Sequence, residues 1–123
     1  TLHVFSGSLA AGQYRRCDAV QEAEYQCSVY DLPARVAGET WPLVLADPPY
    51  SAADAEKYGT PMVNRGKVLR ALAQVTAPGR HLVWLDTVWP MHRKAEWRTA
   101  GRILLQRSTN HRVRLVSIFE RVA

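Results

Sequence analysis

The segment that decides the fold of this chain is Leu43-Val44-Leu45-Ala46-Asp47-Pro48-Pro49-Tyr50. Its first four residues are all apolar, which is typical of a short strand that is buried on both faces of a sheet. The two prolines fix φ and lack backbone donors, and each disfavours a helical conformation for the residue before it. The chain therefore leaves this strand stiff and extended, with free carbonyl groups, a carboxylate at Asp47 and an aromatic ring at Tyr50.

The residues after this segment predict a loop, a helix and a second buried strand. Residues 51–61 are mostly polar and form the predicted loop. Apolar residues recur at three- and four-residue spacings over residues 63–75, as in an amphipathic helix, and the Pro-Gly pair within residues 76–79 is expected to end it. The apolar run at residues 81–85 indicates another buried strand.

The rest of the chain completes an alternating pattern of strands and helices. It predicts strands over residues 2–5, 15–20, 26–30, 102–107 and 113–119, a short helix over residues 90–100 and a hairpin loop over residues 108–111. Strands that alternate with helices and end in a hairpin indicate a three-layer α/β domain with a mixed, mostly parallel sheet. Parallel neighbours joined through a helix are expected to cross over with a right hand.

Length and composition exclude several classes of protein. The chain has 123 residues, 47% of them hydrophobic and 22% charged, as expected for one globular domain over residues 1–123 rather than a disordered protein. No apolar run approaches the roughly 18 residues of a membrane span, and no leader resembling a signal peptide is expected. The net charge of +5 favours a polyanionic partner, although many small basic proteins have none.

The cysteines and histidines do not predict a metal site. Cys17 and Cys27 lie ten residues apart, and neither a paired-cysteine zinc spacing nor a His-Glu-x-x-His motif occurs. We therefore expect no metal and a reduced, cytoplasmic chain. A disulfide between the two cysteines is an open alternative.

Polar residues follow the predicted strands at several points. Residues 6–8, Asp18, Asp31 and residues 47–50 come at or just after such strands. Because ligands of open α/β sheets bind beyond the carboxyl ends of the strands, these residues are expected along one rim. Acceptor oxygens beside an aromatic ring suit a planar substrate that carries an amino group. The alternative is a stiff turn that ends a core strand.

Residues 43–50 resemble motif IV of the amino-methyltransferases, which methylate adenine N6 or cytosine N4 with S-adenosylmethionine. The Asp-Pro-Pro-Tyr form is more typical of the adenine enzymes. Residues 3–8 resemble the start of the family's Phe-x-Gly-x-Gly loop, residues 77–85 its passage into the fifth strand, and the two C-terminal strands its reversed hairpin. The resemblance covers nearly the whole chain and implies a Rossmann-like class I methyltransferase fold.

The resemblance also implies roles for individual residues. Asp47 and the Pro48 carbonyl would hold the target amine, Pro49 would shape the turn and Tyr50 would stack on the base. The cofactor residues implied by the resemblance are Phe5, Ser6 and Gly7 for the methionine part, Asp18 for the ribose, Asp31 with Leu32 for the adenine, and Asp47 next to the methyl group.

The sequence departs from the family pattern in three ways. Leu9 stands in place of the second glycine of the loop, so backbone approach to the cofactor is expected to be looser. Only residues 9–14 separate the first two predicted strands, so the first helices are expected to be shortened or missing. No segment is long enough for a target-recognition domain. Thin helical cover would expose apolar surface, which predicts a homodimer.

Basic and aromatic residues outside the motifs are candidates for contact with nucleic acid. Lys57 and Tyr58 follow the Asp-Pro-Pro-Tyr turn and could close over the base. The densest basic patches, which could contact phosphates, are His92-Arg93-Lys94 and Asn110-His111-Arg112 with Arg114. For each of these groups the alternative is an ordinary solvated surface.

Together these features predict an S-adenosylmethionine-dependent DNA adenine-N6 methyltransferase with short or relaxed sequence specificity. Duplex DNA would require the target base to be flipped out of the stack. RNA adenine, cytosine N4 and a glutamine side chain are alternative targets, although Asp47 argues mildly against the last two. A different class of function is also open, namely a methyltransferase-like subunit that binds nucleic acid without catalysis.

Overall fold

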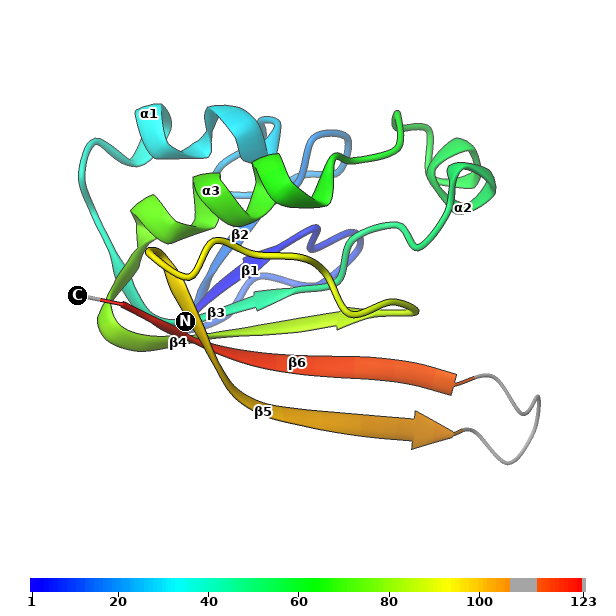
Figure 1. Cartoon of the computed structure of the whole chain (residues 1–123). Coiled ribbons are helices and arrows are strands. Elements are labelled where there is room, and N and C mark those ends of the chain that lie inside the picture. Colours follow the sequence, from blue (N-terminus) through cyan, green and yellow to red (C-terminus); the bar gives the residue numbers. More distant parts are fainter. Residues whose placement is uncertain (107–112, 123) are drawn as a thin grey trace.

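The computed structural model describes residues 1–106 and 113–122, which form a six-stranded mixed sheet (Figure 1). The strand order is β2-β1-β3-β4-β6-β5. The strands are β1 (Leu2–Val4), β2 (Arg15–Cys17), β3 (Trp41–Ala46), β4 (Thr76–Asp86), β5 (Trp97–Gln106) and β6 (Val113–Arg121). β2, β1, β3 and β4 are parallel, whereas β6 is antiparallel to β4 and to β5. The mixed sheet and its C-terminal antiparallel hairpin are therefore confirmed.

Short helices connect the parallel strands, and the longest of them is α3. The helices are α1 (Leu32–Val36), α2 (Ala52–Lys57) and α3 (Arg65–Val75), and a 3-10 turn at Val29–Asp31 precedes α1. The Asn64 side chain begins α3 by accepting a hydrogen bond from the Lys67 amide. The helix ends at Val75, where the Thr76 hydroxyl donates to the Leu72 carbonyl. The predicted helix over residues 63–75 is thus confirmed to within two residues.

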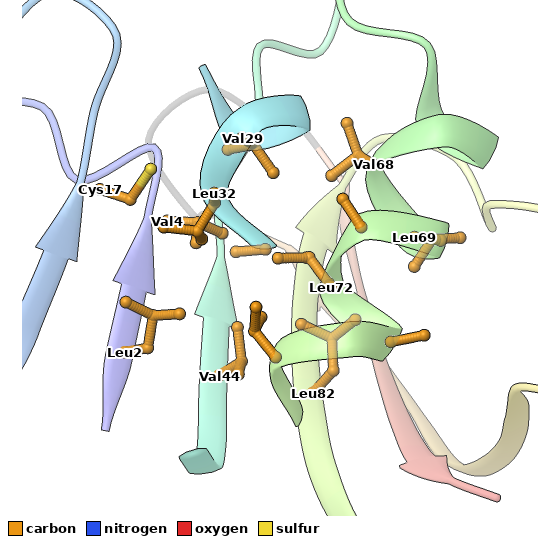
Figure 2. Packing of buried hydrophobic residues seen from close by; sticks show 14 of the residues in the cluster. Leu2, Val4, Cys17, Val29, Leu32, Val44, Val68, Leu69, Leu72 and Leu82 are labelled. Atoms are coloured by element: carbon orange, nitrogen blue, oxygen red, sulfur yellow. The ribbon is translucent and has the colours of Figure 1, made fainter. Parts of the chain in front are cut away.

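The hydrophobic core lies between the sheet and the layer formed by α1 and α3 (Figure 2). Alternate strand residues point toward the helices, as the two-residue period of a strand requires. The labelled core residues are Leu2, Val4, Cys17, Val44 and Leu82 from the strands and Val29, Leu32, Val68, Leu69 and Leu72 from the helical layer. Full burial of each such aliphatic side chain is worth about 1.5–3 kcal/mol. This layer fixes the position of the strand ends that carry the candidate site.

The opposite face of the sheet carries no helix within residues 1–106 and 113–122 (Figure 1). Strand register places a row of apolar side chains there, and all of them are partly exposed: Leu43, Leu45, Val83, Leu85, Val116 and Ile118. The expected shortening or loss of the first helices thus appears in the described residues, where helices cover one face instead of the predicted two. Tyr14, from the loop between β1 and β2, packs edge-on against His3 at the margin of this face.

Two predicted elements are wrong. Residues 26–30 do not form a strand, because the Ser28 side chain accepts a hydrogen bond from the Tyr30 amide and starts the 3-10 turn instead. Residues 90–100 do not form a helix, because the chain enters β5 at Trp97. The Trp97 ring is buried, and its Nε1 donates to the Leu69 carbonyl of α3. Tertiary packing overrides the helical pattern at this point.

The structure also bears on the predicted loop, the cysteines, and the expectations about membrane spans and metal sites. The predicted loop over residues 51–61 contains α2, which begins where the Ser51 hydroxyl accepts from the Asp54 amide. Cys17 and Cys27 are free cysteines, so the disulfide alternative is not observed. Within the part of the chain that the structure describes, no helix is long and apolar enough to cross a membrane, and no cluster of His, Cys, Asp or Glu has the make-up of a metal site.

Candidate functional site

A cavity of about 800 Å³ opens beyond the carboxyl ends of the parallel strands. Figure 1 shows α2 beyond the ends of these strands, where it helps to enclose the space. The lining comes from segments that are far apart in the sequence and includes Phe5, Ser6, Gly7, Asp18, Asp47, Pro48, Pro49, Tyr50, Lys57, Tyr58 and Arg114. Residues 6–8, Asp18 and residues 47–50 therefore share one rim as expected, whereas Asp31 does not line it. The volume of the cavity is in the range of a small-molecule site.

The loop after β1 turns sharply along one wall of the cavity. Phe5 has φ of 57° and Gly7 has φ of 54°, so both residues adopt the left-handed conformation. This conformation is uncommon for a residue with a side chain such as Phe5, and such strain clusters at binding sites. Apart from Gly7 and its two chain neighbours, no heavy atom of the described structure lies within 4 Å of the position that a Cβ of Gly7 would take. The backbone of Gly7 thus borders open space, where a ligand can approach it closely.

Asp18 ties this loop to the segment after β2. Its Oδ2 accepts a hydrogen bond from the Gly7 amide at 2.8 Å, and its Oδ1 accepts from the amides of Val20 at 2.9 Å and Gln21 at 2.8 Å. The carboxylate therefore organises two walls of the cavity through three backbone donors. Oδ2 accepts only one of these bonds and has further acceptor capacity, so a ribose hydroxyl could still be bound there.

Two residues that the resemblance assigns to the cofactor are not brought to the cavity. Leu32 is fully buried in the core, and Asp31 is an exposed residue at the start of α1. The neighbouring residues Ser28, Val29 and Tyr30 line the cavity instead. The displacement follows from the 3-10 turn that replaces the predicted strand, because the turn shifts which residues face the rim.

The Asp-Pro-Pro-Tyr turn, at the end of the neighbouring strand β3, also lines the cavity. All four of its residues belong to the lining, and of these Pro48 and Pro49 are buried. The Tyr50 hydroxyl donates a hydrogen bond to Asp47 Oδ1 at 2.8 Å. Burial raises the pKa of Asp47, and the hydrogen bond from Tyr50 opposes this shift. Burial also raises the pKa of Tyr50, to about 12, so this hydroxyl remains a donor at neutral pH.

A buried ion pair supports this turn from behind, and sequence reasoning assigned it no role. Asp86, at the end of β4, is fully buried. Arg65 Nε donates to Asp86 Oδ2 at 2.7 Å, and Arg65 Nη2 donates both to Asp86 Oδ1 and to the Tyr50 carbonyl, each at 3.0 Å. Trp84 Nε1 and the Thr87 amide also donate hydrogen bonds to the Asp86 carboxylate. In the sequence, the only sign of this ion pair is that Asp86 is an acidic residue directly after a predicted buried strand.

Arg114 comes from β6 and lies against the same turn. Its guanidinium carbon lies 4.7 Å from the centroid of the Tyr50 ring, and its Nη1 donates to the Tyr50 hydroxyl at 2.5 Å. Of the residues predicted to contact nucleic acid, Lys57, Tyr58 and Arg114 line the cavity.

The other predicted nucleic-acid residues are not found at the cavity. His92, Arg93 and Lys94 are not among the residues that line it, and the His92 ring packs 5.0 Å from the Phe119 ring instead. Asn110, His111 and Arg112 lie outside the described residues, so their predicted role stays a prediction. Among the residues that the structure describes, the cationic side chains that line the cavity are therefore Arg114 and Lys57.

Comparison with known proteins identifies the fold. No protein-family model matches the sequence, and no curated protein matches it at a significant level. Among solved structures, TrmN from Thermus thermophilus matches with a TM-score of 0.63 and 13% identity over 98% of this chain and 43% of that chain. The N-methyltransferase NodS from Bradyrhizobium japonicum WM9, in complex with S-adenosyl-L-homocysteine, matches with a TM-score of 0.61 and 12% identity over 98% of this chain and 76% of that chain.

A third similar structure is the antibiotic-resistance methyltransferase Kmr, with a TM-score of 0.58 and 14% identity over 97% of this chain and 85% of that chain. At these identities the likeness concerns the arrangement of the sheet and helices. The chain spans less than half the length of the TrmN structure. It has the Rossmann-like α/β fold of these methyltransferases, in a compact form.

Proposed function

We propose that this protein transfers a methyl group from S-adenosylmethionine to the N6 amino group of adenine in DNA, with short or relaxed sequence specificity. The observation that carries the proposal is that Asp47 and Tyr50 line the same cavity as the Gly7 loop. An acceptor for an amine, an aromatic ring for a base and a glycine loop for a cofactor thus share one space.

The residues on the β1 side of the cavity fit the cofactor. S-adenosylmethionine supplies an electrophilic methyl group when bound. The open space beside Gly7 admits a ligand close to the backbone, and Asp18 holds the loop in that shape. The cavity volume of about 800 Å³ accommodates a nucleoside-sized cofactor and a base. NodS, which has the same fold, was crystallised with the demethylated product of this cofactor.

The residues on the β3 side fit the substrate. The Asp47 carboxylate and the Pro48 carbonyl would accept the two N–H donors of an exocyclic amine and so hold its nitrogen in one orientation. The Tyr50 ring offers an aromatic surface on which a flat base can stack. Catalysis by this chain would consist of positioning and of electrostatic stabilisation as the nitrogen gains positive character. The proton that the amine then loses would pass to solvent.

The proposed polymer substrate is supported by charge. The chain carries a net charge of +5, and Lys57 and Arg114 stand at the cavity itself. Phosphate contacts of this kind add affinity without sequence specificity. These two features support a nucleic-acid substrate with relaxed specificity.

An assay with labelled cofactor tests the proposed function. We expect purified protein to transfer tritium from methyl-labelled S-adenosylmethionine to adenine-containing DNA and to form N6-methyladenine, identified by mass spectrometry. Parallel reactions with double-stranded DNA, single-stranded DNA and RNA show whether the substrate is double- or single-stranded and whether it contains deoxyribose or ribose. Failure to bind the cofactor at millimolar concentration in calorimetry would contradict the proposal and favour the non-catalytic subunit instead.

Substitution of Asp18 should weaken cofactor binding selectively. Asp18→Ala removes the acceptor of three backbone amides, so the Gly7 loop loses its fixed shape. We expect the dissociation constant for S-adenosylmethionine to rise by about tenfold or more, since one such loss is worth at least about 1.4 kcal/mol. Asp31→Ala is the matched control, because this carboxylate is exposed and does not line the cavity. Equal effects of both substitutions in calorimetry would argue against the role of Asp18.

The protein is further proposed to form a homodimer through the open face of the sheet. The partly exposed apolar row on β3, β4 and β6 would otherwise remain in contact with water. We expect static light scattering to give twice the mass of one chain and Val83→Lys to shift the equilibrium toward the monomer. A monomer at high protein concentration would refute this expectation.

A further inference from the structure

The aromatic ring proposed to stack on the base is already engaged within the protein. Arg114 lies over the Tyr50 ring with its guanidinium carbon 4.7 Å from the centroid, and it donates a hydrogen bond to the Tyr50 hydroxyl. That hydroxyl in turn donates to Asp47 Oδ1 at 2.8 Å. Tyr50 thus links Arg114, at the start of β6, to Asp47, at the end of β3.

A planar substrate competes with Arg114 for these partners. A guanidinium group is flat and cationic, and it stacks on an aromatic ring in the way that a base does. Of the two Asp47 oxygens, Oδ1 accepts the Tyr50 hydroxyl. A base can stack on the covered side of the Tyr50 ring only if Arg114 moves away from it.

Arg114 forms no direct ion pair with a carboxylate in the described structure. Three other arginines form ion pairs, namely Arg16 with Glu24, Arg65 with Asp86 and Arg98 with Glu120. Within residues 1–106 and 113–122, no carboxylate lies within ion-pair distance of Arg114. A phosphate near the base would give this guanidinium a charge-assisted, bidentate partner that is stronger than the hydroxyl it leaves.

We propose that Arg114 determines substrate specificity by covering the Tyr50 ring until a phosphodiester draws it away, so that the site accepts an adenine within a polynucleotide and disfavours the free nucleoside. This inference rests on the proposed function and refines its substrate class. A nucleoside must displace Arg114 without giving it a new partner, whereas a base in a polynucleotide brings phosphates with it.

Binding measurements on Arg114→Ala test the inference. The probes are 2′-deoxyadenosine and a fluorescently labelled, adenine-containing oligodeoxynucleotide, each with S-adenosyl-L-homocysteine present. We expect the variant to bind the oligonucleotide about tenfold more weakly and with a salt slope reduced by about one, as for loss of one phosphate contact. We expect it to bind deoxyadenosine several-fold more tightly than the wild type, because nothing has to be displaced.

Two further variants separate this role from simpler ones. Arg102→Ala removes the same charge from the same hairpin, where Arg102 stacks on the Trp89 ring at 4.9 Å and does not line the cavity. Its binding of deoxyadenosine should not change. Arg114→Lys keeps the charge and loses the planar group. We expect it to retain the salt slope and to gain affinity for deoxyadenosine.

The outcomes distinguish this inference from the function on which it rests. If Arg114→Ala weakens both ligands equally, or leaves deoxyadenosine binding unchanged, the proposed specificity role is wrong even when methyl transfer to DNA is normal. If the two ligands respond in opposite directions while no methyl transfer is detected, the role of Arg114 stands and the proposed catalytic function fails. Thermal unfolding of each variant checks that the fold is retained.

Discussion

Replacement of Asp47 by alanine is expected to lower the rate of methyl transfer by about 100- to 1000-fold, as for loss of one positioned polar group that acts on the developing charge. Cofactor affinity should fall much less than the rate, because the Gly7 loop proposed to hold the cofactor is organised by Asp18 and not by Asp47. Single-turnover kinetics with labelled S-adenosylmethionine, together with calorimetry on the same preparation, would measure the two effects separately.

The pH dependence provides a second test of the role of Asp47. Burial raises the pKa of this carboxyl, and the ionised form is the better acceptor for an amine. The wild-type rate should therefore rise with pH, with a midpoint above 3.8, the ordinary pKa of aspartate. A midpoint at or below 3.8 would contradict the role of Asp47 as the ionised acceptor of the amine.

The same shift has a consequence for stability. When the pKa of a carboxyl is higher in the folded than in the unfolded chain, the folded protein becomes less stable as the pH rises from the lower to the higher of these two pKa values. Asp47→Asn keeps an acceptor for the Tyr50 hydroxyl and removes the ionisation. We expect this variant to melt at a higher temperature than the wild type at neutral pH, and the difference should vanish below about pH 4. Asp54→Asn is a control, because Asp54 also lines the cavity and the Tyr50 hydroxyl donates to Asp47 rather than to its carboxyl.

The sequence predicts the central part of this fold well because local and tertiary signals agree there. The apolar residues before Asp47 form β3, and the helical period over residues 63–75 corresponds to α3. β5 and β6 pair in antiparallel fashion, as predicted for the C-terminal hairpin. In each case the pattern of apolar residues is typical of the element that forms, so this pattern alone predicts the element.

The errors occur where contacts between distant residues decide the conformation. Trp97 enters a strand because its ring is buried and bonded to the Leu69 carbonyl, which the local pattern cannot show. The 3-10 turn at Val29–Asp31 depends on one side-chain cap and moves Asp31 out of the cavity. The contact of Arg114 with Tyr50 spans 64 residues, so no motif spacing could reveal it.

The ion pair of Arg65 with Asp86 has the largest expected effect on stability. Arg65→Met keeps the length of the side chain and leaves the fully buried Asp86 carboxylate without its cation. Removal of one partner of a buried pair costs about 3–5 kcal/mol, and we expect the lower end because Trp84 and the Thr87 amide still donate to Asp86. The midpoint of thermal unfolding should fall by about 10 °C or more for a domain of this size.

Arg98→Met is the matched control for this substitution. It breaks the ion pair with Glu120, in which the arginine side chain is 68% exposed, so the expected cost is under about 1 kcal/mol. Calorimetric melting of both variants at one pH would compare the two pairs directly. Similar losses would show that burial does not strengthen the contribution of Arg65.

Arg65 should also affect catalysis in a way that the control does not. Its Nη2 links Asp86 to the Tyr50 carbonyl, so its loss frees the last residue of the Asp-Pro-Pro-Tyr turn. Arg65→Met should therefore lower the methyl-transfer rate well below the melting temperature, with cofactor affinity unchanged. Arg65→Lys can reach one of the two partners at a time and should recover part of the stability but little of the rate. If the lysine restored both equally, Arg65 would act only by neutralising Asp86, and the placement of Tyr50 would have to depend on the two prolines alone.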